Sequence, residues 1–171
     1  PLRPYQRDAV LAAEAALAAD PLARPAIKIA TGGGKSMVLG ALALRAAAHG
    51  RRVLILAHRA EIVKQNAGAV KRLGGHCGLV LASEGAADMR ARITSAMVNS
   101  LHAKLKRPRG RVDAWDLVLI DEAHTVPVKG EGMYRTILLG SHCAQARKVG
   151  VTATPSRLDG GPIYPEPGEE V

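Results

Sequence analysis

Residues 26–36 read Ala26-Ile27-Lys28-Ile29-Ala30-Thr31-Gly32-Gly33-Gly34-Lys35-Ser36, and this stretch decides the fold. Its apolar start predicts a strand, and the alanine- and leucine-rich residues 37–48 that follow predict a helix. A glycine-rich turn between a strand and a helix lets backbone N–H groups converge on phosphate oxygens, and the helix dipole adds to the attraction. The stretch therefore predicts an α/β domain with a phosphate-binding loop.

The side chains of this loop suit a bound nucleotide. Lys35 can reach the terminal phosphates, and the Ser36 hydroxyl is placed to hold a magnesium ion. Ile29 occupies the first glycine position of the pattern G-x-x-x-x-G-K-[ST], and a glycine-rich turn can also serve tight packing alone. The predicted nucleotide-binding residues of the loop are Thr31, Gly32, Gly33, Gly34, Lys35 and Ser36.

A pair of carboxylates supplies the second half of a site. The apolar run 117–120 predicts a buried parallel strand, and Asp121-Glu122-Ala123-His124 follows it directly. Open α/β sheets bind ligands at the carboxyl ends of their strands. We therefore expect Lys35 to lie beside Asp121 and Glu122, facing one pocket for a metal-bound triphosphate. The alternative, a solvated acidic turn, does not account for the long apolar strand before it.

Basic residues outnumber acidic ones in this chain of 171 residues. Lysine and arginine number 24 against 15 aspartate and glutamate, so the formal net charge is +9. Such a charge favours a polyanionic partner, nucleic acid first, although it can also serve solubility alone. Aromatic residues make up only 2% of the chain, so we expect nucleic acid to be held through its phosphates and not by base stacking.

The two cysteines, Cys77 and Cys143, have neither the spacing of a disulfide framework nor that of metal ligands. We expect both to be reduced and buried, in a cytoplasmic protein. The 47% of hydrophobic residues suffices for a core, and no apolar run reaches membrane-spanning length, so no membrane partner is expected. Pro1 stands where a methionine is usual, which favours a trimmed or partial chain.

Strand and helix patterns alternate along the chain, which predicts a three-layer α/β fold around a mostly parallel sheet. Basic residues concentrate in 104–111, which we expect to be a solvated loop. The predicted strands cover 26–29, 53–57, 77–82, 92–98, 117–120 and 148–151, and the predicted helices cover 4–19, 37–48, 60–73 and 133–146.

Weaker candidates stand at other element ends. Gln6 and Arg3, at the start of the first helix, suit an adenine edge and a stacked ring, or are ordinary surface residues. His58 and Arg59 follow the strand 53–57: Arg59 suits a phosphate, and His58 suits a ligand contact or a capping or core position. Asn99 follows the fourth strand and suits either a bound strand or a helix cap.

Together these segments resemble a known family. Arg3–Gln6, Ala30–Ser36, Ala57–Arg59, Asp121–His124 and Val151–Pro155 occur in the order found in the first half of a superfamily 2 helicase motor. The chain resembles the amino-terminal RecA-like domain of a DEAH-box, type III restriction-like DNA helicase and is similar to RadD-type proteins, over about residues 1–158. The resemblance implies a RecA-like P-loop NTPase domain with ATP and Mg²⁺ as cofactors.

The resemblance also assigns roles in the nucleotide site. Gln6, with Arg3, resembles the adenine-reading motif, and the glycine-rich loop with Lys35 resembles the motif around the β- and γ-phosphates. Asp121 resembles the carboxylate that, with Ser36, holds magnesium. Glu122 resembles the base that orients the attacking water, since phosphoryl transfer mostly needs alignment and charge neutralisation.

Other residues resemble the nucleic-acid side of such motors. His124, Thr152 and Thr154 resemble the groups that link the nucleotide site to the nucleic-acid face, and Arg59, with His58, matches the motif on the sugar-phosphate backbone. Asn99 falls near the fourth strand, where the family often has glutamine and threonine or serine, so this contact departs from the pattern. The resemblance implies DNA before RNA.

We expect residues 1–155 to form the ATP-binding domain and 156–171 a linker or tail toward a second RecA-like domain that this chain lacks. The chain would then be half of an ATP-dependent helicase or translocase, nearly inactive alone because the second domain supplies an arginine finger. The alternatives are a restriction-enzyme motor that translocates without unwinding, a P-loop kinase or other NTPase, and a non-catalytic fragment that binds ATP or nucleic acid.

Overall fold

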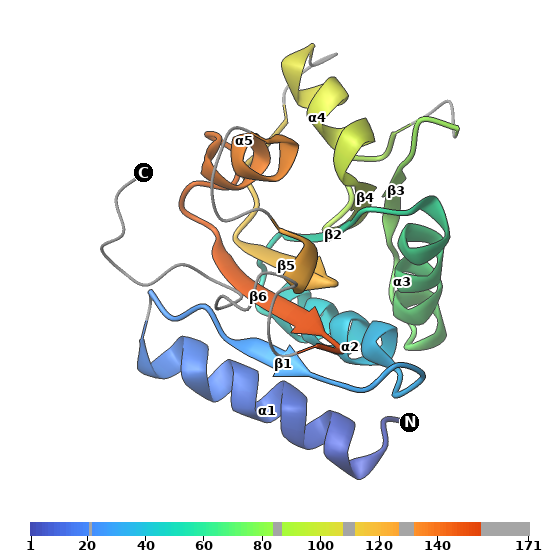
Figure 1. The fold of residues 1–171 in the computed structure, drawn as a ribbon, viewed down its shortest axis with the longest axis vertical. Coiled ribbons are helices and arrows are strands. Elements are labelled where there is room, and N and C mark those ends of the chain that lie inside the picture. Colours follow the sequence, from blue (N-terminus) through green and yellow to red (C-terminus); the bar gives the residue numbers. More distant parts are fainter. Residues whose placement is uncertain (21, 84–86, 108–111, 127–131, 155–171) are drawn as a thin grey trace.

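A computed structural model describes residues 1–20, 22–83, 87–107, 112–126 and 132–154. Six strands form one sheet in the order β1-β6-β5-β2-β4-β3, and each neighbouring pair is parallel (Figure 1). The strands are β1 (Ala26–Lys28), β2 (Val53–Ala57), β3 (Gly78–Val80), β4 (Ile93–Met97), β5 (Leu117–Asp121) and β6 (Arg147–Thr152).

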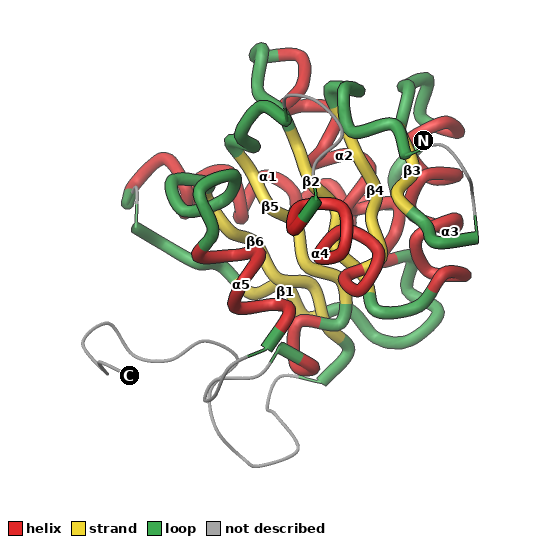
Figure 2. The backbone as a smooth tube through the Cα atoms, turned by 90° about the horizontal axis from the view of Figure 1, so that it is seen from above, coloured by secondary structure: helices red, strands yellow, loops and turns green. Residues whose placement is uncertain are grey.

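Helices cover both faces of the sheet. Figure 2 shows α4 and α5 in front of the strands and α1, α2 and α3 behind them. Their bounds are α1 (Pro4–Ala19), α2 (Lys35–Ala48), α3 (Ala60–Arg72), α4 (Val98–Lys106) and α5 (Met133–Leu139), and a 3₁₀ turn, η1, covers Ala123–Thr125. The predicted three-layer α/β architecture is confirmed.

The central strands are buried on both faces, as their unbroken apolar sequences predict. All five residues of β2 and of β5 are buried. Ile55 pairs with Leu119 in register, and both pack in the core beneath α1, α2 and α3. The next pair, Leu56 and Ile120, packs in the core beneath α4 and α5, because successive side chains of a strand point to opposite faces.

The structure corrects two element predictions. The helix predicted over 133–146 ends at Leu139, where Gly140, a poor helix former, continues as extended backbone (φ −65°, ψ 157°). Part of the predicted basic loop, residues 104–106, belongs to α4. Val98 and Leu101 give this helix a buried face, and its lysines lie in the last turn, where the helix dipole favours them.

Both cysteines are free and buried, as predicted, and burial raises the pKa of Cys77 to about 11 and that of Cys143 to about 12. In the described ranges, no helix combines the length and the apolarity needed to cross a membrane. The predicted linker 156–171, Pro155 of the last motif and the basic residues 108–111 lie outside the described residues.

Candidate nucleotide-binding site

The candidate site lies at the edge of the sheet where the strands end. Because β6 lies between β1 and β5 and all three are parallel, their carboxyl ends meet at one edge. In Figure 1 the arrowheads of these strands point toward the loop that precedes α2. The phosphate-loop residues after β1, the carboxylates at the end of β5 and Thr152 at the end of β6 are thereby brought together.

Glycine is required in the loop by both conformation and space. Gly34, which precedes the first residue of α2, has left-handed backbone (φ +80°, ψ 40°). Gly33 has no room for a side chain, since a Cβ there would lie 2.6 Å from Cγ2 of Ile29. Ile29 is itself buried, so the residue that replaces the first glycine of the pattern packs beneath the loop.

An ion pair joins the two halves of the site. Lys35 Nζ lies 2.9 Å from Glu122 Oε1, and the two side chains are only 13% and 21% exposed. Lys35 is the first residue of α2, and Glu122 follows β5 directly. The expected juxtaposition of the phosphate loop with the carboxylate pair is therefore confirmed.

Asp121 is held from two sides. Its Oδ2 accepts a hydrogen bond from Asn66 Nδ2 at 3.0 Å, and its Oδ1 accepts one from the Glu122 backbone N–H at 3.0 Å. Burial raises the pKa of the Asp121 carboxyl, and the charge of Glu122 raises it further, while the bond from Asn66 and the charge of Lys35 act in the opposite direction. The carboxylate is thus fixed in place with few of its lone pairs used.

Glu122 has left-handed backbone (φ +53°, ψ 52°), and no other non-glycine residue in the described segments has a positive φ. Its carbonyl oxygen accepts hydrogen bonds from the Thr125 hydroxyl at 2.8 Å and the Thr125 backbone N–H at 2.9 Å. These bonds close η1 and hold the turn. Glu122 keeps this unusual conformation while its carboxylate pairs with Lys35, and residues strained in this way cluster at active sites and ligand clamps.

His124 connects this turn to β6. Its Nδ1 is hydrogen-bonded to Thr152 Oγ1 at 2.7 Å and lies 3.4 Å from Glu122 Oε2. Thr152 Oγ1 donates to the Thr154 carbonyl oxygen at 3.0 Å and accepts from the Thr154 backbone N–H at 3.2 Å. The three predicted coupling residues therefore form one connected network that begins at Glu122.

The start of α1 is bound to the phosphate loop. Gln6, which is 5% exposed, donates from Nε2 to the Gly33 carbonyl oxygen at 3.0 Å and accepts at Oε1 from the Arg3 backbone N–H at 2.9 Å. The interpretation of Gln6 as an ordinary surface residue is therefore wrong. Its Nε2 can donate one more hydrogen bond and its Oε1 can accept one more. Adenine recognition by Gln6 therefore stays a prediction, as does the role of the exposed Arg3.

The remaining predicted residues follow the same edge of the sheet on other strands. Arg59 is exposed at the end of β2, beside β5, and the adjacent His58 has a buried Nδ1 that finds no hydrogen-bond partner in the described part of the chain. Asn99 is exposed in the first turn of α4, two strands from β5. Met97 precedes the first residue of α4, so the expectation that Asn99 caps a helix is wrong.

Sequence reasoning missed two contacts in this region. The Tyr5 hydroxyl donates to the Gly33 carbonyl oxygen at 2.8 Å, and Asn66 on α3 holds Asp121. Tyr5 adjoins Gln6, so its place in the first motif was an available signal. Asn66 lies 55 residues from its partner, and no local pattern connects the two.

The residues present fit a magnesium nucleotide. Ser36 is buried in the first turn of α2, and Asp121 is buried at the tip of β5. Hydroxyl and carboxylate oxygens are the ligands that Mg²⁺ prefers, and the ion is usually shared between one or two carboxylates and substrate phosphates. Ser36 and Asp121 would hold the ion.

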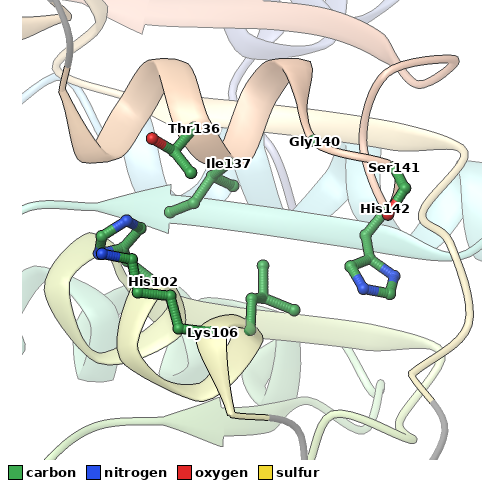
Figure 3. A pocket seen from close by; sticks show the side chains of 8 residues that line it. His102, Lys106, Thr136, Ile137, Gly140, Ser141 and His142 are labelled. Carbon is green, nitrogen blue, oxygen red and sulfur yellow. The ribbon is translucent and has the colours of Figure 1, made fainter.

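A separate hollow of about 190 Å³ lies between α4 and α5 (Figure 3). It is lined mainly by the second half of α4, by α5 and by the turn before β6, with His102 and His142 on opposite sides (Figure 3). None of the predicted site residues lines it.

A parallel sheet with a phosphate loop after one strand and a carboxylate pair after another defines a RecA-like P-loop nucleotide-binding domain. The chain belongs to the family described as type III restriction enzyme, res subunit, whose family model matches residues 1–157. The fold is shared with helicase domains of known structure. No curated protein sequence matches the chain significantly.

Several solved structures share the fold. The Hef helicase domain of Pyrococcus furiosus is 24% identical with a TM-score of 0.69 and covers 91% of this chain. The UvsW helicase from bacteriophage T4 is 20% identical with a TM-score of 0.65 and covers 90%. The type ISP restriction-modification enzyme LlaGI, solved with a DNA substrate mimic, is 16% identical with a TM-score of 0.69 and covers 95%. The chain spans 33%, 52% and 18% of those three chains, respectively.

Proposed function

We propose that this chain binds ATP with Mg²⁺ and is the nucleotide-binding half of a DEAH-box motor that moves on DNA. The observation that carries this proposal is the 2.9 Å ion pair between Lys35 and Glu122. This contact supports the proposal because Lys35 would bind phosphate and Glu122 would orient water at the same place. A packing role for the glycine-rich turn would not require either group to face the other.

In this proposal the residues have separate roles in phosphoryl transfer. Lys35 exchanges its contact with Glu122 for the terminal phosphates and offsets the charge that develops there. Glu122, released from Lys35, orients the attacking water and accepts its proton. Ser36 and Asp121 would hold a magnesium ion, which would supply further charge neutralisation.

Movement requires that the nucleotide site be coupled to a DNA grip. The network of His124, Thr152 and Thr154 begins at Glu122, so a change in the position of that carboxylate is transmitted to β6. Arg59, exposed one strand away, and the net charge of +9 suit contact with the DNA backbone. The names of the similar structures, two helicases and an enzyme solved with a DNA substrate mimic, agree with such a partner.

A second candidate is translocation along duplex DNA without strand separation. The family description, which names the res subunit of type III restriction enzymes, favours it. Both candidates use the same ATP site, and a strand-separation assay on a longer protein that contains this domain would distinguish them.

Nucleotide binding is the direct test. We expect Lys35→Ala to abolish or strongly reduce binding of a fluorescent ATP analogue in the presence of magnesium, because the loop loses its cation. Lys71→Ala is the matched control, since Lys71 is exposed in the last turn of α3, outside the site. Equal binding by the two variants would remove the basis of the proposal.

A further inference from the structure

Asn66 is a buried polar residue on the apolar face of a helix. It lies in α3, three residues after Val63 and four before Val70, and all three side chains are 0% exposed. Asparagine is a poor helix former, and an apolar side chain would fill this position without burying an amide. Packing alone therefore does not explain the residue.

The attachment of α3 to the sheet does not explain it either. The Ser95 hydroxyl on β4 donates to the Val63 carbonyl oxygen at 3.0 Å, which already joins the helix to a strand. Asn66 instead reaches the tip of β5, where its Nδ2 donates to Asp121 Oδ2 at 3.0 Å. Its Oδ1 is buried and has no partner among the described residues, so the bond to Asp121 is the contact that its amide makes.

We propose that Asn66 is a positioning residue for the magnesium carboxylate, an inference that rests on the proposed function. Asn66 fixes one oxygen of Asp121 while the Glu122 N–H fixes the other, so the carboxylate plane cannot rotate. A fixed plane keeps the remaining lone pairs directed into the site. Hydrogen-bond partners of this kind hold metal ligands in their binding orientation in many proteins.

The prediction concerns the magnesium-dependent part of nucleotide binding. We expect magnesium to strengthen binding of a non-hydrolysable ATP analogue by the unaltered chain. In Asn66→Ala, the ratio between the affinities measured with magnesium and with EDTA should fall about 10–100-fold, while the affinity in EDTA stays unchanged. Ser95→Ala, which removes a buried hydrogen bond to α3 without touching Asp121, should keep the full ratio.

The outcomes separate this inference from the proposed function. An unaltered chain that shows no effect of magnesium would overturn the proposed function. Two results would overturn the positioning role alone. In one, magnesium strengthens nucleotide binding by Asn66→Ala as much as by the unaltered chain; in the other, Asn66→Ala loses the same factor of nucleotide affinity with magnesium and with EDTA. If Asn66→Ala does not fold in circular dichroism, Asn66→Leu, which keeps most of the side-chain volume, is measured in the same way and read by the same criteria.

Discussion

Glu122 has a backbone conformation that costs stability, and its side chain lies in the candidate site. A side chain with left-handed backbone costs roughly 1–2 kcal/mol relative to the right-handed conformation. The carboxylate nonetheless occupies this position, paired with Lys35 and close to His124. A turn selected for stability alone would use glycine here, since glycine adopts positive φ without that cost.

A comparison of two variants isolates this strain. Glu122→Gly and Glu122→Ala both remove the ion pair, but only alanine keeps a Cβ at φ +53°. We expect the glycine variant to unfold with a free energy about 1 kcal/mol higher than the alanine variant, measured by urea denaturation, because strain relief exceeds the greater freedom of unfolded glycine. Equal stability of the pair would show that the turn is not strained.

Asp121 predicts a dependence of stability on pH. Burial raises its pKa above the ordinary aspartate value, so the folded chain binds this proton more tightly than the unfolded chain. Its contribution to stability is therefore lost as the pH rises from the ordinary aspartate range through the raised pKa. Asp121→Asn should remove this loss, making the variant more stable than the unaltered chain above that window and not below it.

Thermal unfolding of both proteins across that pH range provides the measurement. The charged neighbours of Asp121 are Glu122, which adds to the upward shift of its pKa, and Lys35, which opposes it. A stability difference between the two proteins that does not change with pH would contradict the assignment to Asp121.

At the scale of elements, Arg52 connects the amino ends of several strands. These ends lie at the edge of the sheet opposite the one that holds the candidate site. Arg52 precedes β2 and donates from Nη2 to the Met89 carbonyl oxygen at 2.6 Å and from Nη1 to the Asp113 carbonyl oxygen. Its guanidinium also lies 5.5 Å from the centre of the Trp115 ring. One side chain thereby fixes the segments that lead into β4 and β5.

We expect Arg52→Ala to lower the free energy of unfolding by about 2 kcal/mol, from lost hydrogen bonds and the cation–π contact. Arg51→Ala, at the exposed neighbouring position, should have little effect. Nucleotide binding measured well below the melting temperature should survive in both variants, because Arg52 lies at the other end of the strands. A selective loss of binding in Arg52→Ala would contradict this purely structural role.

The same scale shows what the sequence can and cannot predict. The phosphate loop and the strand before Asp121 are local patterns, and a parallel sheet brings strand ends together whatever the details, so Lys35 and Glu122 could be placed correctly. The extent of α5 could not, because a single glycine such as Gly140 can lie inside a helix as well as at its end. Asn66 looks like a surface residue in a helix pattern, and its burial depends on a strand tip 55 residues away.

At the scale of the whole molecule, most of the candidate site lies along one edge of the sheet, and the start of α1 adds Tyr5 and Gln6 against the phosphate loop. The phosphate loop, the carboxylate pair and the coupling network follow β1, β5 and β6, while the predicted DNA-contacting Arg59 follows β2. Under the proposed function, these groups would contact the bound triphosphate. The chain also spans only 18–52% of the similar structures, which leaves room in such proteins for a second contacting domain.

The arrangement predicts that the chain binds ATP but turns it over poorly. Under the proposed function, the described groups would bind phosphate, hold magnesium and orient water, and an arginine from a second domain would complete the site. Such an arginine contributes about 10³–10⁵ in rate, so turnover should rise by a similar factor in a longer protein that contains both domains. Steady-state ATP hydrolysis by both proteins, with and without DNA, measures this ratio of turnover rates. The Lys35→Ala variant is the control for ATPase activity from contaminants. Vigorous, DNA-stimulated hydrolysis by the chain alone that Lys35→Ala abolishes would show that this half of the site suffices.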